Sequence, residues 1–98
     1  MITSKQRSKL RGMANTMEPV TQVGKGGITP AVVHTLSAAL EKRELIKVTV
    51  LPTVDKTPRE VCEELAALLN AEPVQAIGNK ITLYRVSSRK DVTHISLD

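Results

Sequence analysis

Aromatic side chains are almost absent from this chain of 98 residues, which contains no Trp, no Phe and a single Tyr, Tyr84. Hydrophobic residues still make up 41% of the sequence, so we expect a globular protein whose core is built from aliphatic side chains. Proteins that read single-stranded nucleic acids usually stack the bases on Phe, Tyr or Trp. The scarcity of these residues argues against such a surface and favours contacts with phosphates and sugars if the partner is a nucleic acid.

Cysteine is equally scarce, because Cys62 is the only one, and this excludes an internal disulfide framework. Cys62 borders an apolar helical stripe, which predicts a small core residue rather than a reactive thiol. The N-terminal sequence MITSKQRSKL lacks the apolar region of a signal peptide, and no run approaches the roughly 18 apolar residues of a membrane span. We therefore expect a cytoplasmic protein without a membrane partner.

Residues that would carry catalysis or hold a metal are also sparse. His34 and His94 are far apart and have no Cys or carboxylate at metal-ligand spacing. The sequence contains neither GxSxG nor HExxH. Glu60, Glu63 and Glu64 fall in the first turns of a predicted helix, where they complement the dipole and face solvent. The sequence therefore predicts no catalytic site, no metal site, no cofactor and no small-molecule substrate.

Positive charge is present and unevenly distributed. The net charge is +4, and residues 29–98 contain nine basic and nine acidic residues, so the whole excess lies in residues 1–28. Only Glu18 opposes the basic residues there, which are Lys5, Arg7, Lys9, Arg11 and Lys25. Such asymmetry suggests a polyanionic partner, although a solvated helix face would have the same composition.

Hydrophobic periodicity and capping signals define the expected elements. Thr3 with Gln6 and Thr57 with Glu60 form capping boxes, and Thr29 followed by Pro30 is a good helix start. Gly78-Asn79 suits a two-residue hairpin turn. The predicted elements are a helix from Thr3 to Pro19, a strand over 20–23, a helix from Thr29 to about Arg43, a strand over 45–50, a helix from Thr57, and strands over 74–77 and 80–85.

Details of the expected packing follow from the same periodicity. Met13 and Leu68 fall on the predicted apolar stripes of their helices. In the last strand, Ile81 and Leu83 alternate with Lys80, Thr82 and Tyr84, which predicts one covered and one half-polar face. The residues after Val86 are polar and predict a loosely held tail, in which His94 to Leu97 would add at most a short strand.

The order helix, strand, helix, strand, helix, hairpin is typical of an α/β domain of two layers. We expect the order α-β-α-β-α-β-β, a mixed four-stranded sheet with parallel crossovers and one antiparallel pair, and helices mainly on one face.

A glycine-rich loop, VGKGGITP at residues 23–30, joins the first strand to the second helix. The unpaired amides and the dipole of a helix N-terminus favour a phosphate there, and glycine lets the backbone approach it. The P-loop pattern is absent, and a dinucleotide fingerprint fails because Thr29 occupies its third glycine position. Gly24-Lys25-Gly26-Gly27 fits GxxG, which clamps the nucleic-acid backbone in KH-type domains. A turn that merely requires positive φ remains the alternative.

Four stretches give the chain a resemblance to a known family: SKQRSKLRGMA, VGKGGIT, ALEKRELIKV and VQAIGNKITLYR. Over about residues 3 to 86 the chain resembles the CRM domain (chloroplast RNA splicing and ribosome maturation) in its bacterial stand-alone, YhbY-like form. The resemblance implies a fold similar to the C-terminal domain of a bacterial translation initiation factor. It also implies an RNA-binding GxxG loop and association with ribosomal RNA in precursor large subunits.

The resemblance places the RNA-binding residues on the loop, on the basic first helix and at the end of the second helix, with an extension across the open face of the sheet. We thus expect a CRM-like domain over residues 1–86 and a polar C-terminal tail over 87–98 without an assigned role. The expected RNA-binding residues are Gly24, Lys25, Gly26, Gly27, Thr29, Lys5, Arg7, Lys9, Arg11, Arg43 and Lys47.

Two other functions remain open at this stage. A small enzyme or sensor would bind a mononucleotide at the same loop, and a protein-interaction module would dock a ribosomal protein or assembly factor on the half-polar sheet face. Nothing in the sequence suggests an obligate dimer, so we expect a monomer.

Overall fold

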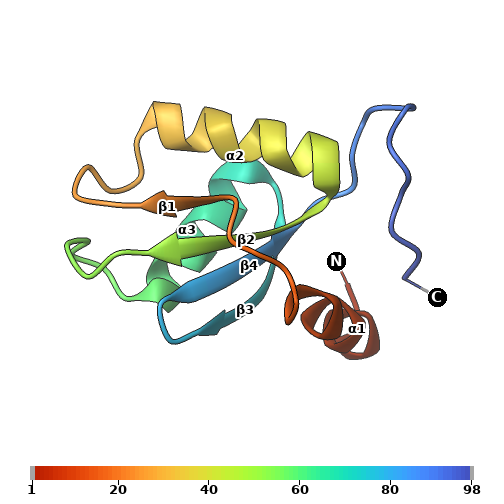
Figure 1. Ribbon diagram of the computed structural model, residues 1–98, viewed down its shortest axis with the longest axis horizontal. Helices are drawn as coiled ribbons and strands as arrows, with labels where there is room; N and C mark the ends of the chain where they lie inside the picture. Colours follow the sequence, from red (N-terminus) through yellow and green to blue (C-terminus); the bar gives the residue numbers. More distant parts are fainter. Residues whose placement is uncertain (1, 98) are drawn as a thin grey trace.

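Helices and strands follow one another in the predicted order in the computed structural model, which describes residues 2–97 (Figure 1). The elements are α1 (Ser4–Ala14), β1 (Thr21–Val23), α2 (Pro30–Arg43), β2 (Leu45–Val50), α3 (Pro58–Leu69), β3 (Glu72–Ile77) and β4 (Lys80–Tyr84). The predicted fold class is therefore confirmed.

The four strands form one mixed sheet in the order β1-β2-β4-β3. β1 and β2 are parallel, whereas β4 pairs antiparallel with both β2 and β3. The prediction of one antiparallel pair was wrong, because the hairpin inserts β4 between β2 and β3 and so creates a second antiparallel ladder. β1 and β3 are the two edge strands.

Two helices cover one face of the sheet and the third covers part of the other. The main core joins Leu36 and Leu40 of α2 and Leu65 of α3 to Ile46 and Leu83 of the sheet. A smaller cluster joins Leu10 and Ala14 of α1 to Leu45, Val74 and Tyr84. Figure 1 shows α1 apart from α2 and α3, and this arrangement confirms that the helices lie mainly on one face.

The helix starts follow the predicted caps. The side chain of Thr3 accepts a hydrogen bond from the Gln6 amide and that of Thr57 accepts one from the Glu60 amide, and both capping boxes are complete. Thr29 Oγ1 accepts from the Val32 amide at 3.2 Å. The expected end of the first helix at Pro19 was wrong, because α1 already ends at Ala14, with Asn15 as its C-cap.

Several predicted faces differ from the observed burial. Met13 and Leu68 are 39% and 56% exposed, so the apolar stripes of their helices are narrower than expected. Thr82 and Tyr84, predicted on a half-polar face, are buried. The reason is that β4 is an inner strand and α1 covers Tyr84 from the second face.

The segment after Val86 is held to the domain more closely than its composition predicts. Residues 93–97 contain no strand, yet the amides of Ser87 and Ile95 both donate to the carboxylate of Glu44, each at 2.7 Å. Ile95 and Leu97 pack against the smaller cluster beside α1. The expectation of a loosely held tail was therefore wrong, because a buried carboxylate and two apolar side chains fix it.

Candidate nucleic-acid interface

The glycine loop forms a tight turn between the end of β1 and the start of α2. The amide of Gly27 donates to the carbonyl of Gly24 at 2.8 Å, and Gly27 has φ +66°. The amides of Lys25 and Gly26 make no hydrogen bond with any of residues 2–97. The turn therefore presents two unpartnered main-chain donors to solvent, one turn before the capped N-terminus of α2.

The three loop glycines are required to different degrees. Gly27 has a positive φ, which is strained for L residues, so the conformation of the turn requires glycine at this position. A Cβ on Gly24 would lie 3.4 Å from Cδ1 of Leu51, which is a snug but ordinary contact. A Cβ on Gly26 would lie 3.6 Å from Cγ2 of Thr29, so neither space nor conformation requires glycine there. Gly26 is the position that the turn alone leaves unexplained.

A second loop lies beside the glycine loop, because β1 and β2 are parallel and both lead into helices (Figure 1). The two loops enclose a hollow of about 230 Å³, whose lining includes Lys25, Thr53, Asp55, Lys56 and Glu64. The N-termini of α2 and α3 thus meet at the same end of the molecule. Loops that follow adjacent parallel strands meet in this way, so a parallel pairing of the first two strands is the signal that points to Thr53 and Lys56.

The charge at this end is nearly balanced. Lys56 forms an ion pair with Glu64, and Asp55 offsets Lys25 within the same hollow. Lys25 is exposed at the tip of the loop. Attraction of an anion here therefore depends on main-chain amides and two helix dipoles more than on an excess of side-chain charge.

The basic residues of α1 lie elsewhere. Lys5, Lys9 and Arg11 are exposed, while Arg7 is partly buried against β3. Along the longest dimension of the molecule, which is 37 Å, the glycine loop lies near one end and α1 lies towards the other (Figure 1). The structure therefore does not join the four cations of α1 and the loop into one compact patch.

Arg43 and Lys47 are separated from the loop as well. Arg43 is exposed in the last turn of α2, at the opposite end of that helix from Thr29, and lines a hollow with Lys42 and Val20. Lys47 lies on β2 and its carbonyl accepts from the Val20 amide at 2.8 Å. A strand of RNA that contacts both the loop and Arg43 would have to follow β1 and α2.

His34, His94 and Cys62 are residues that the sequence analysis considered for catalysis or metal binding. His34 is exposed, and His94 Nδ1 lies 2.5 Å from Oε2 of Glu44. Cys62 is buried, and burial raises the pKa of its thiol to about 11, so its predicted role as a core residue is confirmed. Within residues 2–97, no three His, Cys, Asp or Glu side chains are grouped to hold a metal ion, and no helix has the length and hydrophobicity to cross a membrane.

Comparisons with known proteins agree with the resemblance seen in the sequence. The model of the CRS1 / YhbY (CRM) domain family matches residues 2–85. A Bacillus subtilis protein named "Probable RNA-binding protein YqeI" is 42% identical over 87 residues, covering 89% of this chain and 91% of that protein. A Haemophilus influenzae protein named "RNA-binding protein" is 32% identical over 91 residues, which cover 93% of this chain and 92% of the relative.

A solved structure has the same fold. The solution structure of SAV1595 from Staphylococcus aureus has a TM-score of 0.79 with this chain and 40% sequence identity, and the match covers 93% of this chain and 95% of the other.

Proposed function

Because the chain belongs to the CRS1 / YhbY (CRM) domain family, we propose that it is an RNA-binding protein whose glycine loop holds the sugar-phosphate backbone. The names of its relatives support RNA as the partner. The observation that carries the proposal is the pair of unpartnered amides of Lys25 and Gly26, set before the N-terminus of α2.

The mechanism follows from the loop geometry. A phosphate that approaches the loop accepts from these two amides, and the ammonium group of Lys25 adds a charge-assisted contact. Gly26 has no side chain, so the backbone of the RNA can come within hydrogen-bonding distance of the main chain. Thr29 fixes the first turn of α2 and so fixes the direction of its dipole. Recognition of this kind reads the shape of folded RNA rather than the identity of its bases.

The other cations extend the interaction. Arg43, at the far end of α2, contacts a second phosphate in the hollow between residues 18–20 and the second half of α2. Lys5, Arg7, Lys9, Arg11 and Lys47 add long-range attraction, which raises the rate of association with a polyanion. We further propose that the protein acts in the cytoplasm as a monomer without catalysis or a cofactor, on ribosomal RNA in precursor large subunits, as the family resemblance implies.

Replacing Lys25 with Glu tests the loop directly. In a titration with a structured ribosomal RNA fragment, we expect weaker binding to every RNA sequence and a salt slope reduced by about one unit, because one phosphate contact is lost. Lys90→Glu is the matched control, since it makes the same charge change on an exposed side chain of the C-terminal segment. Equal losses in both variants would mean that only net charge matters, and the assignment of the loop would fail. Titration with ATP and GTP tests the mononucleotide alternative.

A further inference from the structure

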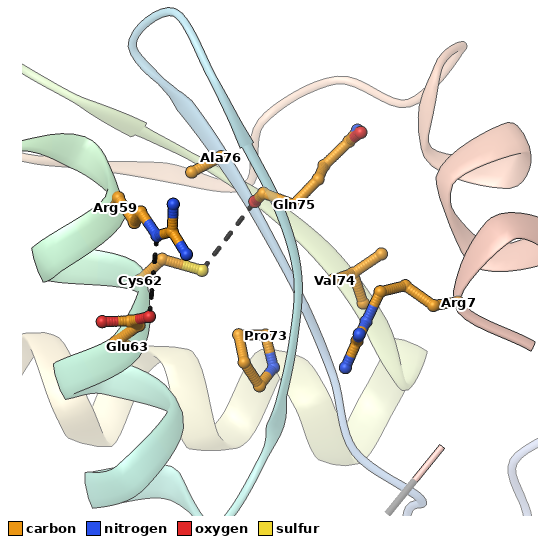
Figure 2. Close-up of a pocket in the computed structure, with 8 residues that line it drawn as sticks. All are labelled: Arg7, Arg59, Cys62, Glu63, Pro73, Val74, Gln75 and Ala76. Atoms are coloured by element: carbon orange, nitrogen blue, oxygen red, sulfur yellow. Dashed lines mark hydrogen bonds and ion pairs between the residues drawn. The ribbon is translucent and has the colours of Figure 1, made fainter. Parts of the chain in front are cut away.

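The edge of the sheet opposite β1 has features that the RNA-binding proposal does not use, since that proposal takes from this region only the charge of Arg7. β3 pairs with β4 on one side only, and no strand within residues 2–97 pairs with its other side. A hollow of about 310 Å³ lies along this open edge, between α1 and α3. Figure 2 shows Arg7 and Arg59 on opposite sides of β3, Arg7 extending from α1 and Arg59 from α3.

Arg7 has an unsatisfied guanidinium nitrogen within the part of the chain that the structure describes. Its Nε is buried and makes no hydrogen bond within residues 2–97. Arg85, by comparison, is partly buried but donates to Glu41 and to the carbonyls of Ser37 and Leu69. An unsatisfied guanidinium nitrogen carries a free-energy penalty, so the guanidinium of Arg7 is suited to gain from an anionic partner in the hollow.

Arg59 is available on the other side of the strand. Its contact with Glu63 is long, at 3.7 Å, and the two side chains are 83% and 63% exposed. Exposed pairs of this kind contribute little, so Arg59 can exchange Glu63 for another carboxylate at small cost. The hollow is therefore lined by two cationic side chains, Arg7 and Arg59, and by one weakly paired carboxylate, that of Glu63.

The edge itself is suited to an added strand. An edge strand presents main-chain donors and acceptors that an extended segment can pair with. Ile77, at the hairpin end of β3, is 67% exposed, so this edge presents an apolar side chain to solvent. The register shift between Pro73 and Gln75 leaves the stretch from Gln75 to Ile77 in regular pairing with β4. This stretch provides a short, regular edge next to an exposed apolar side chain.

We propose that the open edge of β3 binds an extended acidic segment of a protein partner, which adds to the sheet as a fifth strand. Successive side chains of a strand point to opposite faces, so two acidic residues that are neighbours in sequence would reach Arg7 on one face and Arg59 on the other. Ile77 would contact an apolar side chain of the same segment. This inference does not depend on the proposed function of the glycine loop, because the two surfaces lie at opposite edges of the sheet.

Two other occupants fit less well. RNA would gain nothing from the apolar side chain of Ile77, and the chain has no Phe or Trp with which to stack bases. A second copy of this chain would bring its own Arg7 and Arg59 to the same edge, and like charges at a shared edge oppose pairing.

Two peptides of equal charge test the geometry in the full-length protein. Both are Val- and Thr-rich octapeptides with two glutamates, which are adjacent in the first and separated by one residue in the second. The adjacent pair faces both sides of an added strand, whereas the separated pair faces one side only. Binding is followed by the chemical shifts of the protein's backbone amides as each peptide is added up to about 1 mM. We expect the first peptide to bind about tenfold more tightly than the second, and we expect the shifted amides to be centred on β3.

Matched variants complete the test. Arg59→Gln, an exposed change, and Arg7→Gln should each abolish the preference for adjacent glutamates, while Lys25→Glu in the glycine loop should leave it unchanged. Equal affinity of the two peptides, no shifts at β3, or a dimer that dissociates in Arg59→Gln on sedimentation would each overturn the proposal. It would also be overturned if a ribosomal RNA fragment displaced the peptide from β3. A failed peptide titration would leave RNA binding at the glycine loop intact, so the two proposals fail separately.

Discussion

Glu44 shows how much a single residue can organise in a small domain. Its side chain is fully buried, and it occupies the C-cap of α2 with φ +65°, a conformation that non-glycine residues rarely adopt. Burial alone would raise the pKa of its carboxyl group. Hydrogen bonds from His94 and from the amides of Ser87 and Ile95 outweigh burial and lower this pKa below its ordinary value of 4.5.

Glu44→Gln is expected to destabilise the fold by about 2 kcal/mol at neutral pH, because an amide nitrogen would replace a buried acceptor and leave a donor unpaired. The lowered pKa also predicts a pH dependence. Stabilisation by the carboxylate is fully present above pH 4.5 and is lost as the pH falls through the folded-state pKa. Urea unfolding at pH 7 and pH 4 measures both effects.

Since Glu41, Glu60 and Asp91 also have lowered pKa values, the wild-type protein loses stability in acid from several groups. The informative quantity is therefore the difference between the two proteins, and we expect Glu44→Gln to lose less stability between pH 7 and pH 4. Parallel losses would show that Glu44 is not the linked group.

The loop glycines allow a second comparison between single residues. Gly26→Ala places a methyl group in ordinary van der Waals contact with Thr29 at an ordinary φ, so stability should not fall. Gly27→Ala forces a Cβ into a left-handed conformation and should cost about 1 kcal/mol in unfolding free energy. If the backbone at Gly26 contacts phosphate, Gly26→Ala should nevertheless weaken RNA binding about tenfold. Thermal unfolding and RNA titration of both variants separate a role in the turn from a role in RNA binding. Unchanged RNA affinity of Gly26→Ala would mean that the loop serves only as a turn.

Among the elements, the starts of the helices were the most predictable feature. The Thr and Gln or Glu of a capping box lie within four residues, and all their partners belong to the same segment, so local sequence is sufficient to define them. The exposed faces of Met13 and Leu68 and the burial of Thr82 were not predictable in this way. They depend on which element covers which face, and that is decided by contacts between segments far apart in the chain.

The caps of α2 and α3 provide a prediction at this scale. Thr29→Ala and Thr57→Ala each remove a hydroxyl that accepts a hydrogen bond from a helix amide, and each should lower stability by about 1 kcal/mol. Thr29 caps the helix that follows the glycine loop, whereas Thr57 acts on an anion there only through the dipole of α3, so Thr29→Ala should weaken RNA binding more than Thr57→Ala. Calorimetry and RNA titration of the two variants make the comparison, and equal affinities would argue that the N-terminus of α2 does not take part.

At the scale of the whole molecule, the sequence predicted the fold class but not the arrangement of the candidate site. Lys5 to Arg11 and Lys25 lie close in sequence, which predicts one basic region, yet β1 separates α1 from the loop. Conversely, Lys56 lies 31 positions after Lys25 and lines the same hollow. Which loops meet is a property of the strand order, and the order β1-β2-β4-β3 could not be derived from local patterns.

The C-terminal segment raises the remaining question at this scale, which is where the folding unit ends. Sequence alone placed the boundary after Val86, but Ser87 is buried and Ile95 and Leu97 cover the cluster that holds α1 on the sheet. Removing residues 87–98 should therefore leave a folded domain of lower stability. We expect a loss of about 3 kcal/mol, because two partly buried aliphatic side chains and the hydrogen bonds to Glu44 disappear.

Loss of this segment should act mainly on α1, since its anchor residues Leu10 and Ala14 share the cluster with Ile95 and Leu97. Hydrogen exchange of the truncated protein should therefore show faster exchange in α1 than in α2 or α3. Because α1 carries most of the excess positive charge, the truncated protein should also associate with RNA more slowly, while contacts at the glycine loop persist. Uniform protection in all three helices would place the boundary at Val86, as composition alone predicted, and would mean that the segment does not position α1.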